Sequence, residues 1–284
     1  MKAIFEEEST EAILLVDAEN AFNNLNRKAA LHNIKQLCPT FHRYLANTYQ
    51  MPAKMIINDQ SGLECIYSEE GSTQGDVSAM GMYAIGTRPL IDILNKRGKQ
   101  VWYADDSSGA GTLSEVKEWW DELNRAGPKF GYYPKPSKTV LILKDETSLD
   151  RAKEIFLNTG IKISTEGERH LGAVIGSTEF KEKYVNSKIA KWIEDVEQLA
   201  LIAKDEPQLA LSAYNKALSM RWCFVQRTIS NIKDNFIPLE EVIREKLIPA
   251  IIGRKVSDIE RRILALPVRL GGIGIQNPVQ TAEN

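Results

Sequence analysis

The stretch VWYADDSSGAG, Val101 to Gly111, places two adjacent carboxylates, Asp105 and Asp106, directly after an apolar run that is typical of a strand. Two like charges side by side repel each other, and a solvated turn or a bound cation relieves the repulsion. The small residues SSGAG allow the chain to return antiparallel to QVWYA. The segment therefore predicts a tight hairpin with both carboxylates at or near its tip.

A third carboxylate follows another apolar run. AILLV, residues 12–16, predicts a buried strand that ends at Asp17. If this strand neighbours the hairpin in one antiparallel sheet, three carboxylates meet in a small volume. Two Mg²⁺ ions about 3.5–4 Å apart relieve such a cluster and serve in-line phosphoryl transfer. Each aspartate alone fits an ordinary turn residue equally well, so only the constellation points to a metal site.

The remaining patterns of the first half alternate helices and strands. Residues 53–58 and 63–68 predict a hairpin, residues 73–96 a helix that Pro89 interrupts, and residues 138–144 a strand. The clearest helix follows Thr112, because Thr112 and Glu115 form a capping-box pattern and the apolar residues then recur at helical spacing. Gln74 and Gly75 are expected at the start of the 73–96 helix, where glycine permits close approach and a helix N-terminus favours phosphate.

The second half changes character. Residues 169–176 form one strand-like piece, and long helical patterns then cover residues 180–203, 207–229 and 236–252. The pattern predicts an α+β domain over residues 1–178, followed by a helical region over residues 179–284.

Composition excludes several classes of protein. With 284 residues, 43% of them hydrophobic, the chain can bury a sizeable core. Its three cysteines have no CxxC spacing, which argues against a zinc site and a disulfide framework. No apolar run has membrane-spanning length and no signal peptide is visible. A soluble intracellular protein is expected, with nucleus and cytoplasm left open.

Charge is unevenly distributed along the chain. Residues 1–106 hold 10 Lys and Arg against 14 Asp and Glu, whereas residues 180–284 hold 16 against 13. This distribution is expected if a cation site lies early and a polyanion contact late, although ordinary solvated faces explain it equally well.

Five motifs together resemble, in the right order, the palm motifs of reverse transcriptases. They are VDAENAF with Asp17 and Phe22, STQGD with Gln74 and Gly75, YADD with Asp105 and Asp106, PSKTV with Lys138, and HLG at His170, Leu171 and Gly172. The likeness runs from about residue 12 to 176. It implies a polymerase palm, an antiparallel sheet packed by helices, followed by an α-helical thumb-like region. YADD resembles the retroelement enzymes, of the non-long-terminal-repeat kind, more than viral RNA-dependent RNA polymerases.

The resemblance also implies roles for individual residues. Asp17, Asp105 and Asp106, with the Ala18 carbonyl, would hold two Mg²⁺ ions, or Mn²⁺ in their place. Lys138 would protonate the leaving pyrophosphate, but a solvated lysine fits its position as well. The incoming nucleotide would meet Phe22, which excludes a 2′-hydroxyl, and Gln74 with Gly75. His170, Leu171 and Gly172 would grip the primer end.

The implied activity is RNA-directed DNA polymerisation within a retrotransposon polyprotein. Its partners would be an RNA template, a DNA primer, deoxynucleoside triphosphates and other parts of that polyprotein, and no membrane. Only 16 residues precede Asp17, so the fingers region of the family is expected to be largely missing and the chain alone to synthesise little. Two alternatives stay open: a non-catalytic retroelement remnant that binds nucleic acid or a partner, and an RNA-dependent RNA polymerase.

Overall fold

A computed structural model describes residues 1–59, 62–96 and 98–282, which divide into two compact units. The first unit is Met1–Glu168 and the second is Arg169–Asn284. This division falls earlier in the chain than the boundary expected at residue 178, because the HLG segment groups with the helical unit. The assignment of the units to palm and thumb stays a prediction.

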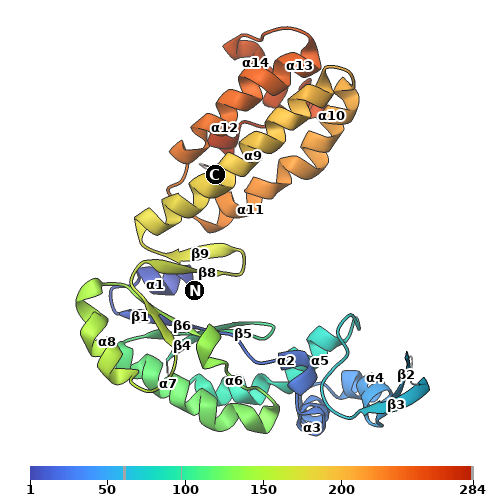
Figure 1. The fold of residues 1–284 in the computed structure, drawn as a ribbon, viewed down its shortest axis with the longest axis vertical. Helices are drawn as coiled ribbons and strands as arrows, with labels where there is room; N and C mark the ends of the chain where they lie inside the picture. Colours follow the sequence, from blue (N-terminus) through green and yellow to red (C-terminus); the bar gives the residue numbers. More distant parts are fainter. Residues whose placement is uncertain (60–61, 97, 283–284) are drawn as a thin grey trace. The chain divides into compact units, whose positions relative to one another are not determined.

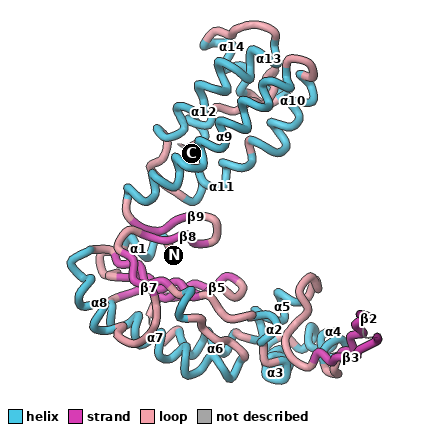
Figure 2. The backbone as a smooth tube through the Cα atoms, viewed as in Figure 1, coloured by secondary structure: helices cyan, strands magenta, loops and turns pink. Residues whose placement is uncertain are grey.

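The first unit is built on a five-stranded sheet with the order β4-β5-β1-β6-β7. Figure 2 draws its strands in magenta. Its strands are β1 (Ala12–Val16), β4 (Lys99–Tyr103), β5 (Asp106–Gly111), β6 (Val140–Leu143) and β7 (Lys162–Ser164). Strand β1 is buried along its whole length because β5 and β6 flank it and helices cover the sheet. The expected antiparallel sheet is in fact mixed, because β7 runs parallel to β6.

Helix α7 (Leu113–Ala126) covers this sheet (Figure 1). Its capping box forms as the sequence predicts: Thr112 accepts a hydrogen bond from the Glu115 backbone N–H, and the Glu115 carboxylate accepts one from Thr112. Trp119 and Trp120 are both buried in the core of this unit. The other helices beside the sheet are α1 (Lys2–Glu6), α8 (Leu149–Ile155) and the short 3₁₀ helices η1 (Gly127–Phe130), η2 (Pro136–Lys138) and η3 (Glu146–Ser148).

A helical part completes the first unit. It contains α2 (Ala21–Asn24), α3 (Arg27–Leu37), α4 (Pro39–Tyr49), α5 (Ala79–Gly86) and α6 (Arg88–Leu94). The interruption expected at Pro89 is present, since α5 ends at Gly86 and Pro89 occupies the first turn of α6. The expected helix start at residue 73 was wrong, because α5 begins only at Ala79.

The hairpin expected between these helices is present as β2 (Ala53–Asp59) and β3 (Gly62–Ser68), which pair antiparallel. Its loop residues 60–61 lie outside the described residues. The hairpin forms a separate two-stranded sheet with exposed apolar side chains, among them Ile56 and Leu63.

The second unit begins with strands β8 (Gly167–His170, which spans the division between the units) and β9 (Ala173–Gly176). Its helices are α9 (Thr178–Ala203), α10 (Pro207–Ala213), α11 (Met220–Thr228), α12 (Ile237–Val242), α13 (Ile248–Ile252), α14 (Asp258–Ala265) and α15 (Pro278–Thr281), with π-helical turns η4 (Tyr214–Leu218) and η6 (Ile243–Leu247) and 3₁₀ helices η5 (Asp234–Phe236) and η7 (Val268–Leu270). The π turns join α10 to α11 and α12 to α13, so the long helical patterns are largely continuous.

Aromatic rings fill the core of the second unit. The Trp192 ring lies 5.8 Å from Trp222 and 6.3 Å from Phe236, measured between centroids. Helix α14 was not predicted, although Ser257 and Glu260 form a capping box at its start. Its Arg261 is buried and forms an ion pair with Glu240 of α12 at 2.6 Å, which fixes α14 against that helix. No helix among the described residues has the length and apolar character to cross a membrane.

The contact between Gly109 and Trp119 offers a test of the packing between β5 and α7. A Cβ atom at Gly109 would lie 2.7 Å from the Trp119 ring. Gly109→Ala should therefore lower the free energy of unfolding by about 1–3 kcal/mol, the usual cost of overpacking a core. Urea unfolding measures this change. On a Trp119→Phe background, where the ring is smaller, the same substitution should cost less; an equal cost on both backgrounds would contradict the contact.

Candidate active site

Asp17 lies where the central strand of the sheet ends. Strand β1 stops at Val16, and the chain then forms a bridge between Ala18 and Pro134. The Asp17 backbone carbonyl accepts a hydrogen bond from the Lys135 N–H at 2.9 Å, while its side chain stays 42% exposed. Ala18, the expected additional ligand through its carbonyl, is itself buried. The Asp17 carboxylate is therefore held at a fixed strand end and remains open to solvent.

Asp105 and Asp106 lie at the tight turn between β4 and β5. The last pair of that ladder is Tyr103 with Asp106, which leaves Ala104 and Asp105 as the two turn residues. Ala104 has a φ of 55°, a left-handed conformation that is uncommon for residues with a side chain. Strained backbone of this kind persists only where the surrounding structure imposes it. The hairpin and its two carboxylates at the tip are as the sequence predicts.

The register between β1 and β5 brings Asp17 to Asp106. These strands pair antiparallel with Val16 opposite Ser107, so the next positions along the ladder are Asp17 and Asp106. Residues opposite one another on neighbouring strands project from the same face of a sheet. Asp17 and Asp106 are thus neighbours, and Asp105 precedes Asp106 in the turn.

The charges of the three carboxylates act on one another. The pKa of Asp106 is raised above its ordinary value, first by burial and then by the negative charges of Asp105 and Asp17. Burial is the main cause of the raised pKa of Tyr132, and the negative charges of Asp105, Asp106 and Asp17 raise it further. The folded protein therefore concentrates negative charge at this edge of the sheet.

The chemistry of this donor set fits Mg²⁺, which prefers carboxylate oxygens and would relieve the repulsion. Within residues 1–59, 62–96 and 98–282, no group of three or more acidic, histidine or cysteine side chains is already arranged as a metal site. A lysine neutralises part of the charge instead: Lys138, at the end of η2, places its Nζ 3.4 Å from the Asp17 Oδ2. A divalent ion at Asp17 would compete with this ammonium group.

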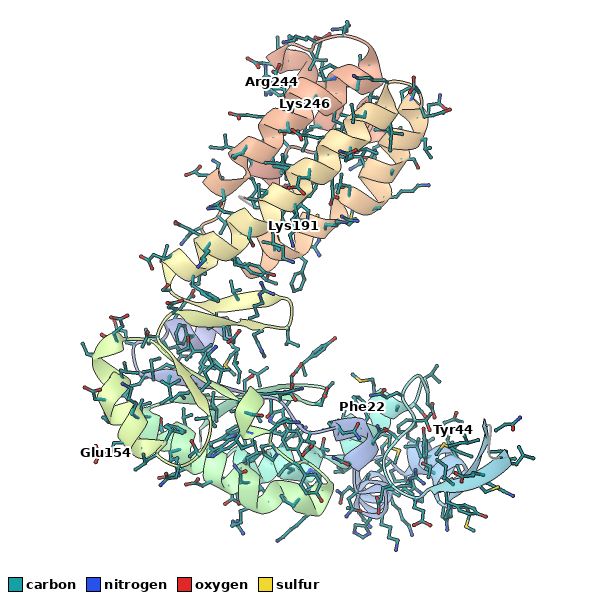
Figure 3. All side chains as sticks on the ribbon, viewed as in Figure 1. Phe22, Tyr44, Glu154, Lys191, Arg244 and Lys246 are labelled. Atoms are coloured by element: carbon teal, nitrogen blue, oxygen red, sulfur yellow. The ribbon has the colours of Figure 1, made fainter. Side chains whose placement is uncertain are left out.

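Phe22 lies on α2, the short helix that follows Asp17 (Figure 3). Its half-buried ring packs on Tyr83 of α5, with 4.8 Å between the ring centroids and 33° between the planes. The Phe22 carbonyl accepts a hydrogen bond from the Ser72 N–H at 2.8 Å. This bond ties α2 to the segment that leads to Gln74.

Gln74 and Gly75 form an exposed turn rather than the start of a helix. Sequence reasoning missed the residues that hold this turn. The Tyr49 hydroxyl donates to Asp76 Oδ2 at 2.5 Å and accepts from the Thr73 N–H at 3.3 Å. Asp76 Oδ1 in turn accepts from both the N–H and the hydroxyl of Ser78. The tip of the turn is open, whereas its base is fixed.

Shifted pKa values and a neighbouring cavity also indicate that the turn at Gln74 and Gly75 has a fixed base and an open tip. The hydrogen bonds from Tyr49 and Ser78 lower the pKa of Asp76, and burial raises the pKa of Tyr49. A cavity of about 480 Å³ lies beside the turn and is lined by Gln74, Gly75, Asp76, Tyr49 and the buried Arg27, among others. The Arg27 guanidinium donates to the carbonyls of Ser68, Glu70 and Gly71. Only the Asp-x-Ser pattern before α5 could have indicated part of this arrangement from sequence.

His170, Leu171 and Gly172 belong to the second unit, whereas the three carboxylates belong to the first. The single strand-like piece expected here is a hairpin, with Leu171 and Gly172 at φ of 49° and 79° as its two turn residues. Two positive φ values in succession favour glycine, which supplies the second position. Burial lowers the pKa of His170. The Tyr184 hydroxyl donates to the Gly172 carbonyl at 2.8 Å and holds the turn against α9.

The raised pKa of Asp106 predicts a gain in stability when its charge is removed. A carboxyl group with a raised folded-state pKa stabilises the fold fully below its unfolded pKa of about 3.9, and this contribution is lost as pH rises through the folded pKa. Ionised Asp106 therefore opposes folding at neutral pH.

Asp106→Asn should accordingly raise the melting temperature at about pH 7 without divalent cations, and the gain should shrink toward about pH 3. Calorimetry over this pH range measures the effect. Asp205→Asn, at an exposed aspartate outside the cluster, is the control and should show no such pH-dependent gain. A lower melting temperature for Asp106→Asn at pH 7 would contradict the electrostatic argument.

Comparisons with known proteins bear on the fold. No protein-family model matches the sequence, and no match was found among curated proteins. Among solved structures, the chain is similar to telomerase from Candida albicans in complex with a TWJ fragment of telomeric RNA, with a TM-score of 0.50 and 10% identity. The match covers 99% of this chain but only 47% of that chain, so this protein spans about half of the telomerase it resembles. The chain therefore has a mixed α/β fold similar to that of this telomerase, which fits a polymerase fold.

Proposed function

We propose that this chain is the RNA-directed DNA polymerase domain of a retroelement and that Asp17, Asp105 and Asp106 form its catalytic centre. The observation that carries the proposal is the β1–β5 register, which makes Asp17 and Asp106 neighbours at one edge of a polymerase-like sheet. Three mutually repelling carboxylates are costly to a fold, and a two-metal site gives them a use. The order of the five motifs along the sequence adds the reverse-transcriptase character.

In this proposal Asp17, Asp105 and Asp106 hold two Mg²⁺ ions with the Ala18 carbonyl. Such ions activate the attacking oxygen and neutralise the developing charge of a phosphoryl transfer. The primer 3′-oxygen forms a bond to the α-phosphorus of the nucleotide, and the bond from that phosphorus to pyrophosphate breaks. The chain's own residues orient the reactants and move protons.

Lys138 is the proposed proton donor to the leaving pyrophosphate. Its Nζ lies beside Asp17, so an ammonium proton is present at the edge of the carboxylate cluster. Phe22 would contact the sugar of the incoming nucleotide, and the exposed tip at Gln74 and Gly75 would contact its base or the template. The fixed base of that turn supports a positioning role, because effective phosphoryl transfer depends mainly on alignment and charge neutralisation.

Nucleic acid is the proposed substrate of the second unit as well. A cavity of about 600 Å³ in that unit is lined by Lys188, Lys191 and Phe224, and by Arg221, which forms an ion pair with Asp195 (Lys191 is labelled in Figure 3). Glu194 and Asp195 also line it. Cations beside an aromatic ring suit a phosphate backbone and its bases. The proposed partners are an RNA template, a DNA primer and other parts of a retrotransposon polyprotein.

One observation favours a second candidate, a non-catalytic retroelement domain that binds nucleic acid. The Lys138 ammonium already neutralises part of the Asp17 charge, and the described side chains form no ready-made group of three metal ligands. Such a domain would bind a primer and template without extending the primer.

Primer extension on an RNA template with Mg²⁺ or Mn²⁺ separates the two candidates. Asp17→Asn and Asp106→Asn should each lower the extension rate at least roughly 100- to 1,000-fold, as removal of transition-state charge stabilisation does. Asp205→Asn is the matched control and should extend normally. The assay is run on this chain and on the same chain preceded by the fingers of a related polymerase. Binding without extension in both forms would favour the non-catalytic candidate.

The preference of the protein for ribonucleotides or deoxynucleotides tests both the role of Phe22 and the RNA-polymerase alternative. Phe22→Ala should raise the ratio of ribonucleotide to deoxynucleotide incorporation by about tenfold or more, because truncation removes the clash with a 2′-hydroxyl. Phe41→Ala, at another half-buried ring of the first unit, should leave the ratio unchanged. An unchanged ratio in Phe22→Ala would make Phe22 a core aromatic, and a wild-type preference for ribonucleotides would favour the RNA polymerase.

A further inference from the structure

A buried tyrosine lies beneath the turn that carries Asp105 and Asp106. Tyr132 is completely buried and follows η1, where its backbone N–H donates to the Gly127 carbonyl. Its hydroxyl donates to the backbone carbonyl of Asp105 at 2.9 Å. The same hydroxyl lies 2.7 Å from the Ser107 Oγ. The five motifs that resemble reverse transcriptases do not include Tyr132.

The direction of this hydrogen-bond chain follows from the number of protons. A tyrosine hydroxyl has one proton, and here that proton lies on the Asp105 carbonyl. The Ser107 hydroxyl must therefore donate to Tyr132. Both side chains are fully buried, and so is the bond between them. The chain runs from Ser107 through Tyr132 to the Asp105 carbonyl and spans the turn from one side of Asp106 to the other.

The bonded carbonyl belongs to the peptide group that joins Asp105 to Asp106. Fixing the plane of this peptide fixes the directions in which the two side chains leave the backbone. The preceding residue, Ala104, is in the left-handed region without the freedom of a glycine. An outside contact is needed to hold such a turn in one conformation, and Tyr132 makes that contact.

The Tyr132 ring is held in turn by aromatic neighbours. Trp102 packs edge-on against it, with 5.2 Å between the ring centroids. The indole N–H groups of Trp102 and Trp119 both donate to the Gln100 Oε1, at 2.9 and 3.1 Å. The position of the Tyr132 ring is therefore fixed by these neighbours, so its hydroxyl can orient the turn.

We infer that Tyr132, together with Ser107, is a positioning residue that orients the Asp105–Asp106 peptide for binding of divalent cations. The inference rests on the proposed function, because it takes these carboxylates as ligands. Tyr132 acts through the backbone of a ligand and touches neither ion nor substrate. Loss of such an outer contact typically weakens metal affinity by about 10- to 100-fold.

The test is a titration of the purified full chain with Mn²⁺, in which free Mn²⁺ is measured by electron paramagnetic resonance. The difference between the wild type and Asp106→Asn defines the binding that depends on the carboxylate cluster. Tyr132→Phe should raise the Kd of that binding by roughly tenfold. On the Asp106→Asn background Tyr132→Phe should have no further effect, which a merely structural role would not produce.

Tyr83→Phe is the matched control. Tyr83 is equally buried in the same unit, and its hydroxyl has no hydrogen-bond partner among the described residues. This variant should bind Mn²⁺ like the wild type. If Tyr132→Phe fails to fold by circular dichroism, Ser107→Ala replaces it, since that change removes only the donor to Tyr132 and should raise the Kd severalfold.

The outcomes distinguish failure of the proposed metal site from failure of the positioning role of Tyr132. A wild type that binds no more Mn²⁺ than Asp106→Asn would overturn the proposed metal site and this inference with it. Wild-type binding that depends on Asp106 but is unchanged in folded Tyr132→Phe and Ser107→Ala would overturn the inference alone. An equal loss of affinity in Tyr83→Phe would also overturn it, because the effect would then belong to any buried tyrosine.

Discussion

The pairing of β1 with β5 is the constraint on which the candidate site depends. Because side chains alternate along a strand, a slip of one residue would turn Asp17 to the face opposite Asp106. The sequence of β1 does not choose between these registers, since it is apolar at every position. Strand β5 in turn packs on α7 at Gly109, where a Cβ atom would lie 2.7 Å from the Trp119 ring. The pairing of β1 with β5 thus decides which carboxylates meet at the edge of the sheet.

The site concentrates features that oppose folding. Asp106 has its pKa raised by burial and by like charges, and Ala104 has a left-handed backbone. Such features survive where the rest of the structure imposes them, and they gather at functional sites. Here the imposing elements are the central sheet and the buried Tyr132, while Lys138 offsets part of the charge. The packing of the first unit therefore compensates for the unfavourable charge and backbone conformation at the edge of the sheet that carries the three carboxylates.

Local patterns predicted much of the fold. The hairpin with aspartates at its tip, the capped helix after Thr112 and the break before Pro89 are all present, because each depends on residues close together in the sequence. Two of the failures involve longer-range choices. Strand β7 joins the sheet in parallel, and the helix expected from residue 73 begins only at Ala79 because Tyr49 and Asp76 hold the preceding turn. Helix α14 was missed although its capping box is visible in the sequence.

By itself the sequence determined that Asp17, Asp105 and Asp106 lie at strand ends, since a charged residue directly after an apolar run marks the end of a buried strand. It also determined the order of the motifs that resemble a polymerase. Only the tertiary structure decided that Asp17 and Asp106 are neighbours and that Tyr132 and Tyr49 hold the two turns of the site. Tyr132 lies 27 residues from Asp105, and Tyr49 lies 27 from Asp76. The physical reason is that hydrogen bonds between buried groups depend on how separate elements pack, and no local pattern encodes that packing.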